Sequence, residues 1–274
     1  MKEYAKQLEK QTGNRIQLTF TVADNDVGKQ LADIMDLVNA GNDVVMMCAI
    51  DSKAIASGIK ACQDAGVPAV TVVRPEAEDS GARANAFVGV DTVDQGYTTG
   101  KAVFEKMKKD GKLAQAKALN IIGDLRDENA INRSTGFKMA CKEYNVPIVA
   151  EIECEWNNDL TLQRTTAALA EHPEVNIIFC PTDAVIQGLQ TAMERNNKWF
   201  PYGDPRHVYL GSQDAYPIGY QLTKAGYIDA DTIYDPIIVA KKALEFCIAL
   251  AEGKLDFYGI FVNLSKGQPS QAGP

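Results

Sequence analysis

The chain has 274 residues and a formal net charge of −8, because 36 Asp and Glu outnumber 28 Lys and Arg. An acidic chain lacks the clustered basic side chains that nucleic-acid binding requires, so we expect no nucleic-acid partner. No apolar stretch approaches the ~18 residues that cross a membrane. The length allows one large domain or two of medium size.

Apolar runs of strand length alternate with helical patterns along nearly the whole chain. The run VVMMCAI at residues 44–50 is continuous, as in a strand that is buried on both faces. We expect strands at residues 44–50, 68–73, 86–90, 118–123, 148–155, 175–180, 207–211, 230–233 and 258–262. We expect helices at residues 31–38, 51–65, 94–109, 132–144, 160–171, 183–196, 217–225 and 236–252. This alternation predicts an α/β fold of parallel sheets with helices on both faces.

Polar residues directly follow the expected strands, and in open parallel sheets ligands bind beyond the carboxyl ends of the strands. These positions hold Asp51, Arg74, Asp91, the loop 124–133, Trp156, Thr182, Asp183, Gln213, Asp214, Tyr234 and Asp235. Carboxylates and guanidinium groups bind hydroxyls, and an aromatic face covers the apolar patch of a sugar ring. The set therefore predicts a polyol site rather than a phosphate site.

The catalytic and cofactor motifs that suit such a fold are absent from the sequence. No GxGxxG follows an expected strand, and GYTTGKA at residues 96–102 lacks one spacer and the Ser or Thr of a phosphate-binding loop. The two histidines, His172 and His207, do not follow strands, and the six cysteines show no CxxC or zinc spacing. We therefore predict no enzyme activity, no cofactor and no metal.

Six segments carry a resemblance to a known family. They are VVMMCAID (44–51), AGVPAVTVVRP (65–75), FVGVDTVDQGYTTGKA (87–102), NRSTGFKMA (132–140), HPEVNIIFCPTDAVIQGLQTAM (172–193) and LGSQDAYPIGYQLTKAGYIDADTIYDP (210–236). In this order the chain resembles the periplasmic sugar-binding proteins of ABC importers, of the ribose-binding type. It is also similar to the related effector domains of the lactose-repressor family.

The resemblance implies the type I periplasmic binding fold, which has two doubly wound parallel-sheet lobes. The implied N-terminal lobe comprises residues 1–90 plus 236–260, and the C-terminal lobe comprises residues 91–235 plus 261–274. A three-segment hinge is implied at Asp91, Asp235 and Phe261.

The resemblance also implies roles for single residues. Arg74 of the first lobe and Arg133 of the second would bind sugar hydroxyls, and Trp156 would stack on the ring. Arg74 could instead form a surface salt bridge, and Trp156 could be a packing residue. In a full-length protein, we expect Arg133→Ala to abolish binding without unfolding the chain.

Four further positions complete the implied site, with Asn129 as a weaker fifth. Asp183 would lie at the margin, cap its helix and accept a hydroxyl or order an arginine. Gln213 or Asp214 would accept hydroxyl hydrogen bonds, and the family pattern does not decide between the two. Tyr234 stands where the family often has Gln or Asn, and hinge packing is its alternative role.

The sequence departs from the family pattern in two places. Family members begin with a strand that is central in its sheet, whereas Met1 falls within the expected first helix. We therefore expect a fragment that lacks this strand and binds its ligand weakly or not at all. Val73 stands where the ribose binders carry an acid before the arginine, so we expect a ligand other than ribose.

By resemblance, the function is that of a solute-binding protein. It would capture a sugar between its lobes and deliver it to an ABC transporter permease. The implied location is periplasmic, or extracellular as a lipoprotein anchored at the cell surface, although Met1 leads into the charged stretch KEYAKQLEK without a signal peptide. The alternative is the ligand-sensing domain of a lactose-repressor-type regulator or of a sensory receptor.

Overall fold

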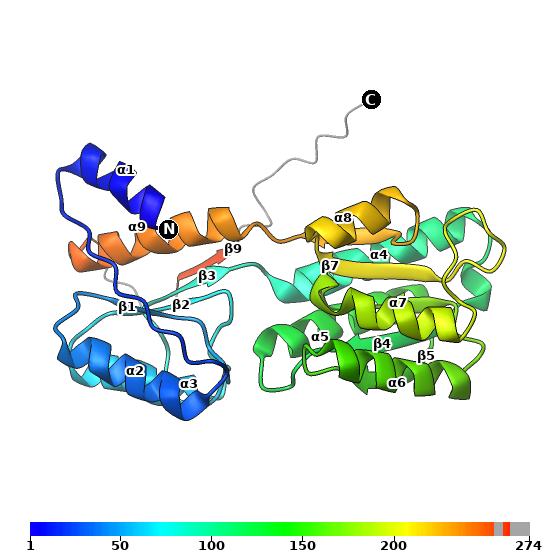
Figure 1. Ribbon diagram of the computed structural model, residues 1–274, viewed down its shortest axis with the longest axis horizontal. Helices are drawn as coiled ribbons and strands as arrows, with labels where there is room; N and C mark the ends of the chain where they lie inside the picture. The colour runs from blue at the N-terminus through cyan, green and yellow to red at the C-terminus, as the bar shows by residue number, and fades with distance from the viewer. Residues whose placement is uncertain (255–259, 264–274) are drawn as a thin grey trace. The chain divides into compact units, whose positions relative to one another are not determined.

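A computed structural model of the chain describes residues 1–254 and 260–263 and divides into two compact units (Figure 1). The first unit comprises Met1–Val90, Arg126–Glu128 and Asp235–Pro274, and the second comprises Asp91–Leu125 and Asn129–Tyr234. The chain therefore changes unit at Asp91 and at Asp235, where two hinge segments are expected. The three residues Arg126–Glu128 also belong to the first unit, although the residues on either side belong to the second. The pattern of strands and helices in the sequence did not predict this.

The first unit is built on a four-stranded parallel sheet in the order β1-β2-β3-β9. Its elements are α1 (Lys2–Thr12), α2 (Val27–Asn39), β1 (Val45–Met47), α3 (Ile55–Asp64), β2 (Ala69–Val72), β3 (Ala86–Gly89), α9 (Pro236–Ala251) and β9 (Ile260–Asn263). Figure 1 shows α2 and α3 on one face of this sheet and α9 on the other. The core on the α2 and α3 side is formed by Ile34, Val45, Ile55 and Ile59, all of which are buried.

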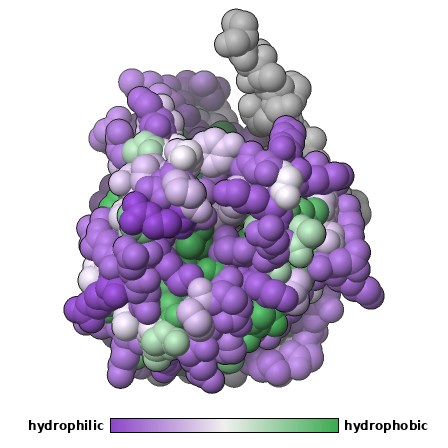
Figure 2. Space-filling model, turned by 90° about the vertical axis from the view of Figure 1, so that its right-hand side faces the viewer, coloured by the Kyte–Doolittle hydropathy of each residue, from purple (hydrophilic) through white to green (hydrophobic). Residues whose placement is uncertain are grey.

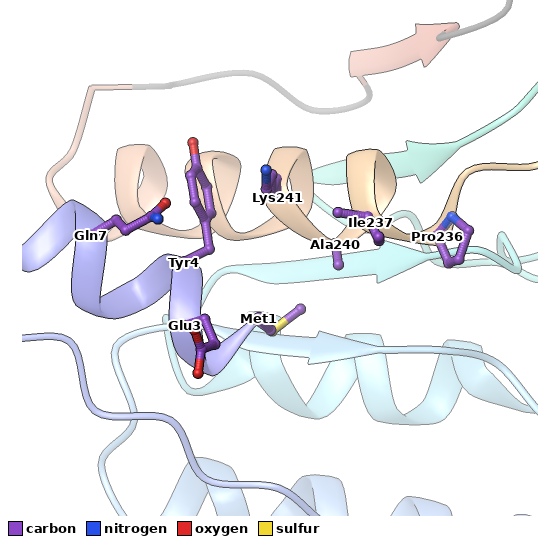
Figure 3. Close-up of a pocket in the computed structure, with 8 residues that line it drawn as sticks. All are labelled: Met1, Glu3, Tyr4, Gln7, Pro236, Ile237, Ala240 and Lys241. Atoms are coloured by element: carbon purple, nitrogen blue, oxygen red, sulfur yellow. The ribbon is translucent and has the colours of Figure 1, made fainter.

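Helix α1 packs on α9, and the first residue of the chain takes part in this contact. The hydroxyl of Tyr4 donates a hydrogen bond to Glu245, and the ammonium of Lys241 lies 5.3 Å from the centre of the Tyr4 ring. Figure 3 shows Met1, Tyr4 and their neighbours on α1 facing α9 across a hollow of about 380 Å³. These contacts attach α1 to α9, although Ala5 is the one residue of α1 that is buried.

The second unit is built on a five-stranded parallel sheet in the order β5-β4-β6-β7-β8. Its strands are β4 (Ala118–Ile122), β5 (Ile148–Glu153), β6 (Ile177–Phe179), β7 (Tyr209–Asp214) and β8 (Ala230–Ile233). Its helices are α4 (Thr92–Lys109), η1 (Leu113–Gln115), α5 (Glu128–Tyr144), α6 (Asn158–Glu171), η2 (Asp183–Val185), α7 (Ile186–Arg195) and α8 (Pro217–Lys224). Ile178 belongs to one core cluster and its neighbours Ile177 and Phe179 to the other, because successive strand residues face opposite sides. Both faces of this sheet are therefore covered.

The predicted fold class is confirmed, and the expected strands lie within a few residues of the observed ones. The largest difference concerns the last strand, because Phe261 in β9 pairs with Phe87 in β3. Residues 260–263 therefore belong to the sheet of the first unit, whereas the resemblance implied that residues 261–274 belong to the second lobe. Residues 264–274 lie outside the described residues. Among the described residues, no strand precedes β1, which forms an edge of its sheet.

Within residues 1–254 and 260–263, no helix is long and apolar enough to cross a membrane. The face of the second unit in Figure 2 is mainly hydrophilic, with small and separate apolar areas. This distribution is ordinary for a surface that is in contact with water.

Candidate functional site

The carboxyl end of the second sheet gathers most of the predicted ligand-binding residues. The strands of this sheet are parallel, so their carboxyl ends lie along one edge. This edge and the first turns of α5 carry Asn129, Arg133, Trp156, Asp183, Gln213, Asp214 and Tyr234. All of them are buried except Trp156 and Tyr234, which are half-buried.

Arg133 is the centre of a buried polar cluster. Its Nη1 donates to the backbone carbonyl of Pro181 at 2.8 Å and to Oδ2 of Asp214 at 3.3 Å. Its Nη2 donates to Oδ1 of Asp214 at 2.6 Å, and both Nη2 and Nε donate to Oε1 of Gln95, at 3.1 and 3.3 Å. Arg133 and Asp214 are only 6% and 8% exposed. The guanidinium therefore has a bidentate carboxylate partner and a fixed orientation.

A close crossing of α4 and α5 places the guanidinium in this cluster. A Cβ atom on Gly96 of α4 would lie 2.0 Å from the backbone oxygen of Arg133, and one on Gly136 would lie 1.9 Å from the backbone oxygen of Val93. Only glycine fits at both positions. The short distance between the helices brings Gln95 within reach of Arg133. Gln95 belongs to this cluster but was not among the predicted residues, because it lies inside α4; the adjacent Gly96, which marks the close contact of the two helices, is the sequence signal for it.

The end of β7 distinguishes Gln213 from Asp214. Asp214 has a φ of 89°, and its Oδ2 also accepts a hydrogen bond of 2.6 Å from Oγ1 of Thr182. Gln213 is fully buried, and neither its side-chain oxygen nor its side-chain nitrogen has a hydrogen-bond partner among the described residues. Buried amide groups are rarely left unpaired, so Gln213 is suited to a ligand or a bound water.

Trp156 covers the end of β4. Glu155 and Trp156 both have positive φ angles, 51° and 56°, in the turn that follows β5. This turn lays the indole ring against Gly123, where a Cβ atom would lie 2.2 Å from the ring. The indole Nε1 is buried and has no hydrogen-bond partner among the described residues. Two consecutive non-glycine residues in the left-handed region are strained, and such strain is common at ligand sites.

Asp183 has a different role from the expected one. The side chain of Thr182 caps η2 by accepting a hydrogen bond from the backbone of Ala184, so the expectation that Asp183 caps its helix is wrong. Asp183 instead accepts hydrogen bonds from Oγ of Ser212 and from the backbone N–H of Tyr216, the latter at 3.0 Å. Because the carboxylate is turned toward β7, it fixes the loop that follows Asp214.

Asp183 has an acidic neighbour, Asp231, and burial raises the pKa of both groups. For Asp231, burial and then the negative charge of Asp183 raise the pKa from 3.8 to about 7. The folded protein therefore keeps a proton that the unfolded chain releases above about pH 4. The contribution of this pair to stability is complete below about pH 4 and is lost as the pH rises to about 7.

We expect Asp231→Asn to flatten the pH dependence of unfolding. The wild-type midpoint of thermal unfolding should fall by several degrees from about pH 5 to about pH 8, and the midpoint of the variant should fall less. Asp36→Asn, on the exposed side of α2, is the matched control and should follow the wild type. Parallel pH profiles for Asp231→Asn and the wild type would contradict the raised pKa.

The first unit carries Arg74 at the end of β2. Val73 has a φ of 66°, which is rare for a β-branched residue, and this turn places Arg74 beside Asp127. Nε of Arg74 lies 2.7 Å from Oδ2 of Asp127, which is buried, while 30% of the Arg74 side chain is exposed. The backbone N–H of Ser52 donates to the carbonyl of Arg126 at 2.8 Å and so helps to hold this segment in the first unit.

The expected hinge residues Asp91 and Asp235 cap the helices that follow them. Asp91 accepts a hydrogen bond of 2.9 Å from the backbone of Asp94, and Asp235 accepts one of 2.9 Å from Ile237. Both lie at the boundaries between the units. Tyr234 precedes Asp235, and its backbone N–H donates to the carbonyl of Asp214 at 3.3 Å. No group of three or more His, Cys, Asp or Glu in the described part of the chain is arranged to hold a metal ion.

A family model described as periplasmic binding protein domain matches residues 1–255. This chain belongs to the periplasmic binding protein family. Its relatives include a candidate rhizopine-binding protein of Rhizobium meliloti, 26% identical over 260 residues, which cover 93% of this chain and 79% of the relative. A ribose import binding protein of Bacillus subtilis is 25% identical over 194 residues, which cover 70% of this chain and 61% of the relative.

Solved structures of periplasmic binding proteins share the fold. A solute-binding protein of Actinobacillus succinogenes with bound D-allose has a TM-score of 0.79 at 22% identity, over 96% of this chain and 89% of that chain. A myo-inositol-binding protein of Caulobacter has a TM-score of 0.78 at 22% identity, over 96% and 88% of the two chains. The predicted type I periplasmic binding fold is confirmed, and so is the prediction of a binding protein rather than an enzyme.

Proposed function

We propose that this protein captures a neutral sugar or a related polyol and delivers it to an ABC transporter. The observation that carries the proposal is the buried cluster of Arg133, Asp214 and Gln95 at the carboxyl end of the second sheet. The names of the relatives support it, because they include ribose import and D-allose-binding proteins. Arg74 of the first unit remains a proposed ligand contact, as does Asn129.

The charges of the cluster favour a neutral ligand. The carboxylate of Asp214 already balances the guanidinium of Arg133 through two hydrogen bonds. An anionic ligand would therefore meet no uncompensated positive charge in the cluster, whereas a ligand hydroxyl can donate a hydrogen bond to the carboxylate of Asp214.

Unpaired side-chain atoms supply the specificity for hydroxyl groups. The amide of Gln213 and the indole Nε1 of Trp156 are buried without a partner among the described residues. Leaving a buried donor or acceptor unpaired costs about 1–3 kcal/mol, which a ligand hydroxyl at the right position recovers. The aromatic face of Trp156 suits the apolar face of a sugar ring.

Calorimetric titration with neutral polyols tests this function. The panel should contain pentoses, hexoses and inositols, with the matching sugar phosphates and sugar acids as anionic controls. We expect binding of at least one neutral polyol and no binding of ribose, because Val73 stands where the ribose binders carry an acid. Binding of an anionic compound in preference to every neutral one would contradict the proposal.

A sensory role is the second candidate. The periplasmic fructose-binding domain of a hybrid two-component system has a TM-score of 0.78 to this chain at 18% identity, so the same fold also occurs in a receptor. Uptake of the labelled ligand by cells with and without the gene separates the two roles. Loss of uptake supports the transporter, and unchanged uptake with altered gene expression supports the sensor.

A further inference from the structure

Two carboxylates hold the turn that follows β7 in the second unit. Oδ2 of Asp183 accepts a hydrogen bond from the backbone N–H of Tyr216 at 3.0 Å, and Oδ1 of Asp231 accepts one from the backbone N–H of Ala215 at 3.2 Å. Asp214 and Ala215, which form this turn, have φ angles of 89° and 50°. Two consecutive non-glycine residues with positive φ are strained, so the turn depends on the groups that hold it from outside.

The same two carboxylates lie beside each other. Ser212 of β7 is the register partner of Asp231 of β8, and the side chains of such partners point to the same face of a sheet. The hydroxyl of Ser212 donates a hydrogen bond to Oδ1 of Asp183, which brings this carboxylate to the same face. A Cβ atom on Gly219 of α8 would lie 1.8 Å from Oδ2 of Asp183, so only glycine leaves room for the carboxylate here.

No cation balances the two acids, because among the described residues neither Asp183 nor Asp231 forms an ion pair. Asp214 of β7 also faces the pair, but Arg133 already balances its charge. Cys180 at the end of β6 faces Asp183 as well, and burial raises the pKa of its thiol well above the ordinary value, so the thiol stays neutral. Oδ2 of Asp231 is buried and has no hydrogen-bond partner in the described part of the chain. A proton shared with Asp183 supplies the donor that this atom lacks.

We propose that Asp183 and Asp231 share one proton, and that this proton holds the turn after β7 in the shape that positions Asp214 for ligand binding. Ionisation of both acids sets two negative charges against each other in a buried place, and movement of the turn relieves the repulsion. Because the turn carries Asp214, its movement disturbs the bidentate pair with Arg133. The two acids are positioning residues, and the inference rests on the proposed sugar site.

The affinity for a neutral polyol should therefore fall as the pH rises through about 7. Burial and then the charge of Asp183 raise the pKa of Asp231 to about 7. Because only the protonated pair holds the turn, the affinity should fall about tenfold from pH 6 to pH 8, and binding should take up about one proton at pH 8 and almost none at pH 6. The two histidines, which ordinarily titrate in this range, lie away from the turn, His172 at the end of α6 and His207 before the start of β7.

Calorimetric titration of the neutral pentoses, hexoses and inositols at pH 6 and pH 8 tests the proposal, in two buffers with different heats of ionisation. Asp231→Asn is neutral at both values, and its amide can accept from Ala215 and donate to Asp183. This variant should bind about tenfold more tightly than the wild type at pH 8 and should take up no proton. His172→Gln is the matched control and should follow the wild type. Equal wild-type affinity at the two pH values, or a parallel loss in Asp231→Asn, overturns the proposal.

A measurement without any polyol separates this proposal from the proposed function. Hydrogen exchange by NMR gives protection factors, corrected for the intrinsic exchange rate, for the amides of Ala215 and Tyr216. Both should fall about tenfold from pH 6 to pH 8 in the wild type and stay constant in Asp231→Asn. If no polyol binds at either pH, the proposed function fails, and these two amides alone decide whether the proton holds the turn. Equal protection at pH 6 and pH 8 in the wild type overturns the proposal.

Discussion

Replacing Arg133 by methionine is expected to lower the free energy of unfolding by about 3–5 kcal/mol and to abolish ligand binding. The loss of stability arises because the carboxyl group of Asp214, which is 8% exposed, loses its bidentate partner. The sequence alone led us to expect loss of binding without unfolding. Because the structure shows that the ion pair is buried, we also expect the free energy of unfolding to fall. Urea unfolding and calorimetric titration with the polyol panel measure the two effects.

A double variant separates stability from binding. Replacing a buried ion pair by apolar residues of similar volume is often neutral or stabilising. Arg133→Met combined with Asp214→Asn removes both charges, and asparagine tolerates the φ of 89° at this position and can still accept from Thr182, so the double variant should recover part of the stability and still bind no ligand. If the double variant binds as tightly as the wild type, the assignment of the site to this cluster is wrong. An unchanged stability of the single variant would contradict the buried pair itself.

The fold could be predicted from the sequence because its strands are buried on both faces. Runs such as VVMMCAI and VNIIFC are continuously apolar, whereas a half-exposed strand alternates apolar and polar residues. Each of these runs is followed by a helix. The pattern could not reveal which sheet receives the last strand. That choice depends on the pairing of Phe261 with Phe87, more than 170 residues earlier in the chain, and local patterns carry no signal for such a contact.

The candidate site could be predicted only where a strand end marks it. Arg133 and Asp214 were found in this way, whereas Gln95 was missed because it lies inside α4 and reaches the cluster through the contact of Gly96 with α5. The helix-capping role expected for Asp183 belongs to Thr182, one residue earlier. Both residue types are common caps, and only the three-dimensional position of β7 shows which one turns toward it.

Gly136→Ala is expected to destabilise the second unit and to weaken ligand binding together. The added Cβ atom would lie 1.9 Å from the backbone oxygen of Val93 and 2.6 Å from the backbone nitrogen of Tyr97, so α4 and α5 must move apart. Overpacking of this kind costs about 1–3 kcal/mol, and more where the clash is with backbone. The separation also carries Gln95 away from Arg133 and so disturbs the orientation of the guanidinium.

Gly28→Ala in α2 provides the matched control for this substitution. Its Cβ atom would meet only Oδ1 of the N-cap residue Asp26, at 3.3 Å, which a shift of a few tenths of an ångström relieves, and alanine favours a helix over glycine by up to about 1 kcal/mol. We therefore expect Gly28→Ala to keep or raise the free energy of unfolding and to leave ligand affinity unchanged. If Gly136→Ala lowers stability but not affinity, the close contact of the two helices supports the fold without positioning Arg133. If Gly136→Ala lowers both stability and ligand affinity and Gly28→Ala lowers neither, the contact at Gly136 positions the binding cluster.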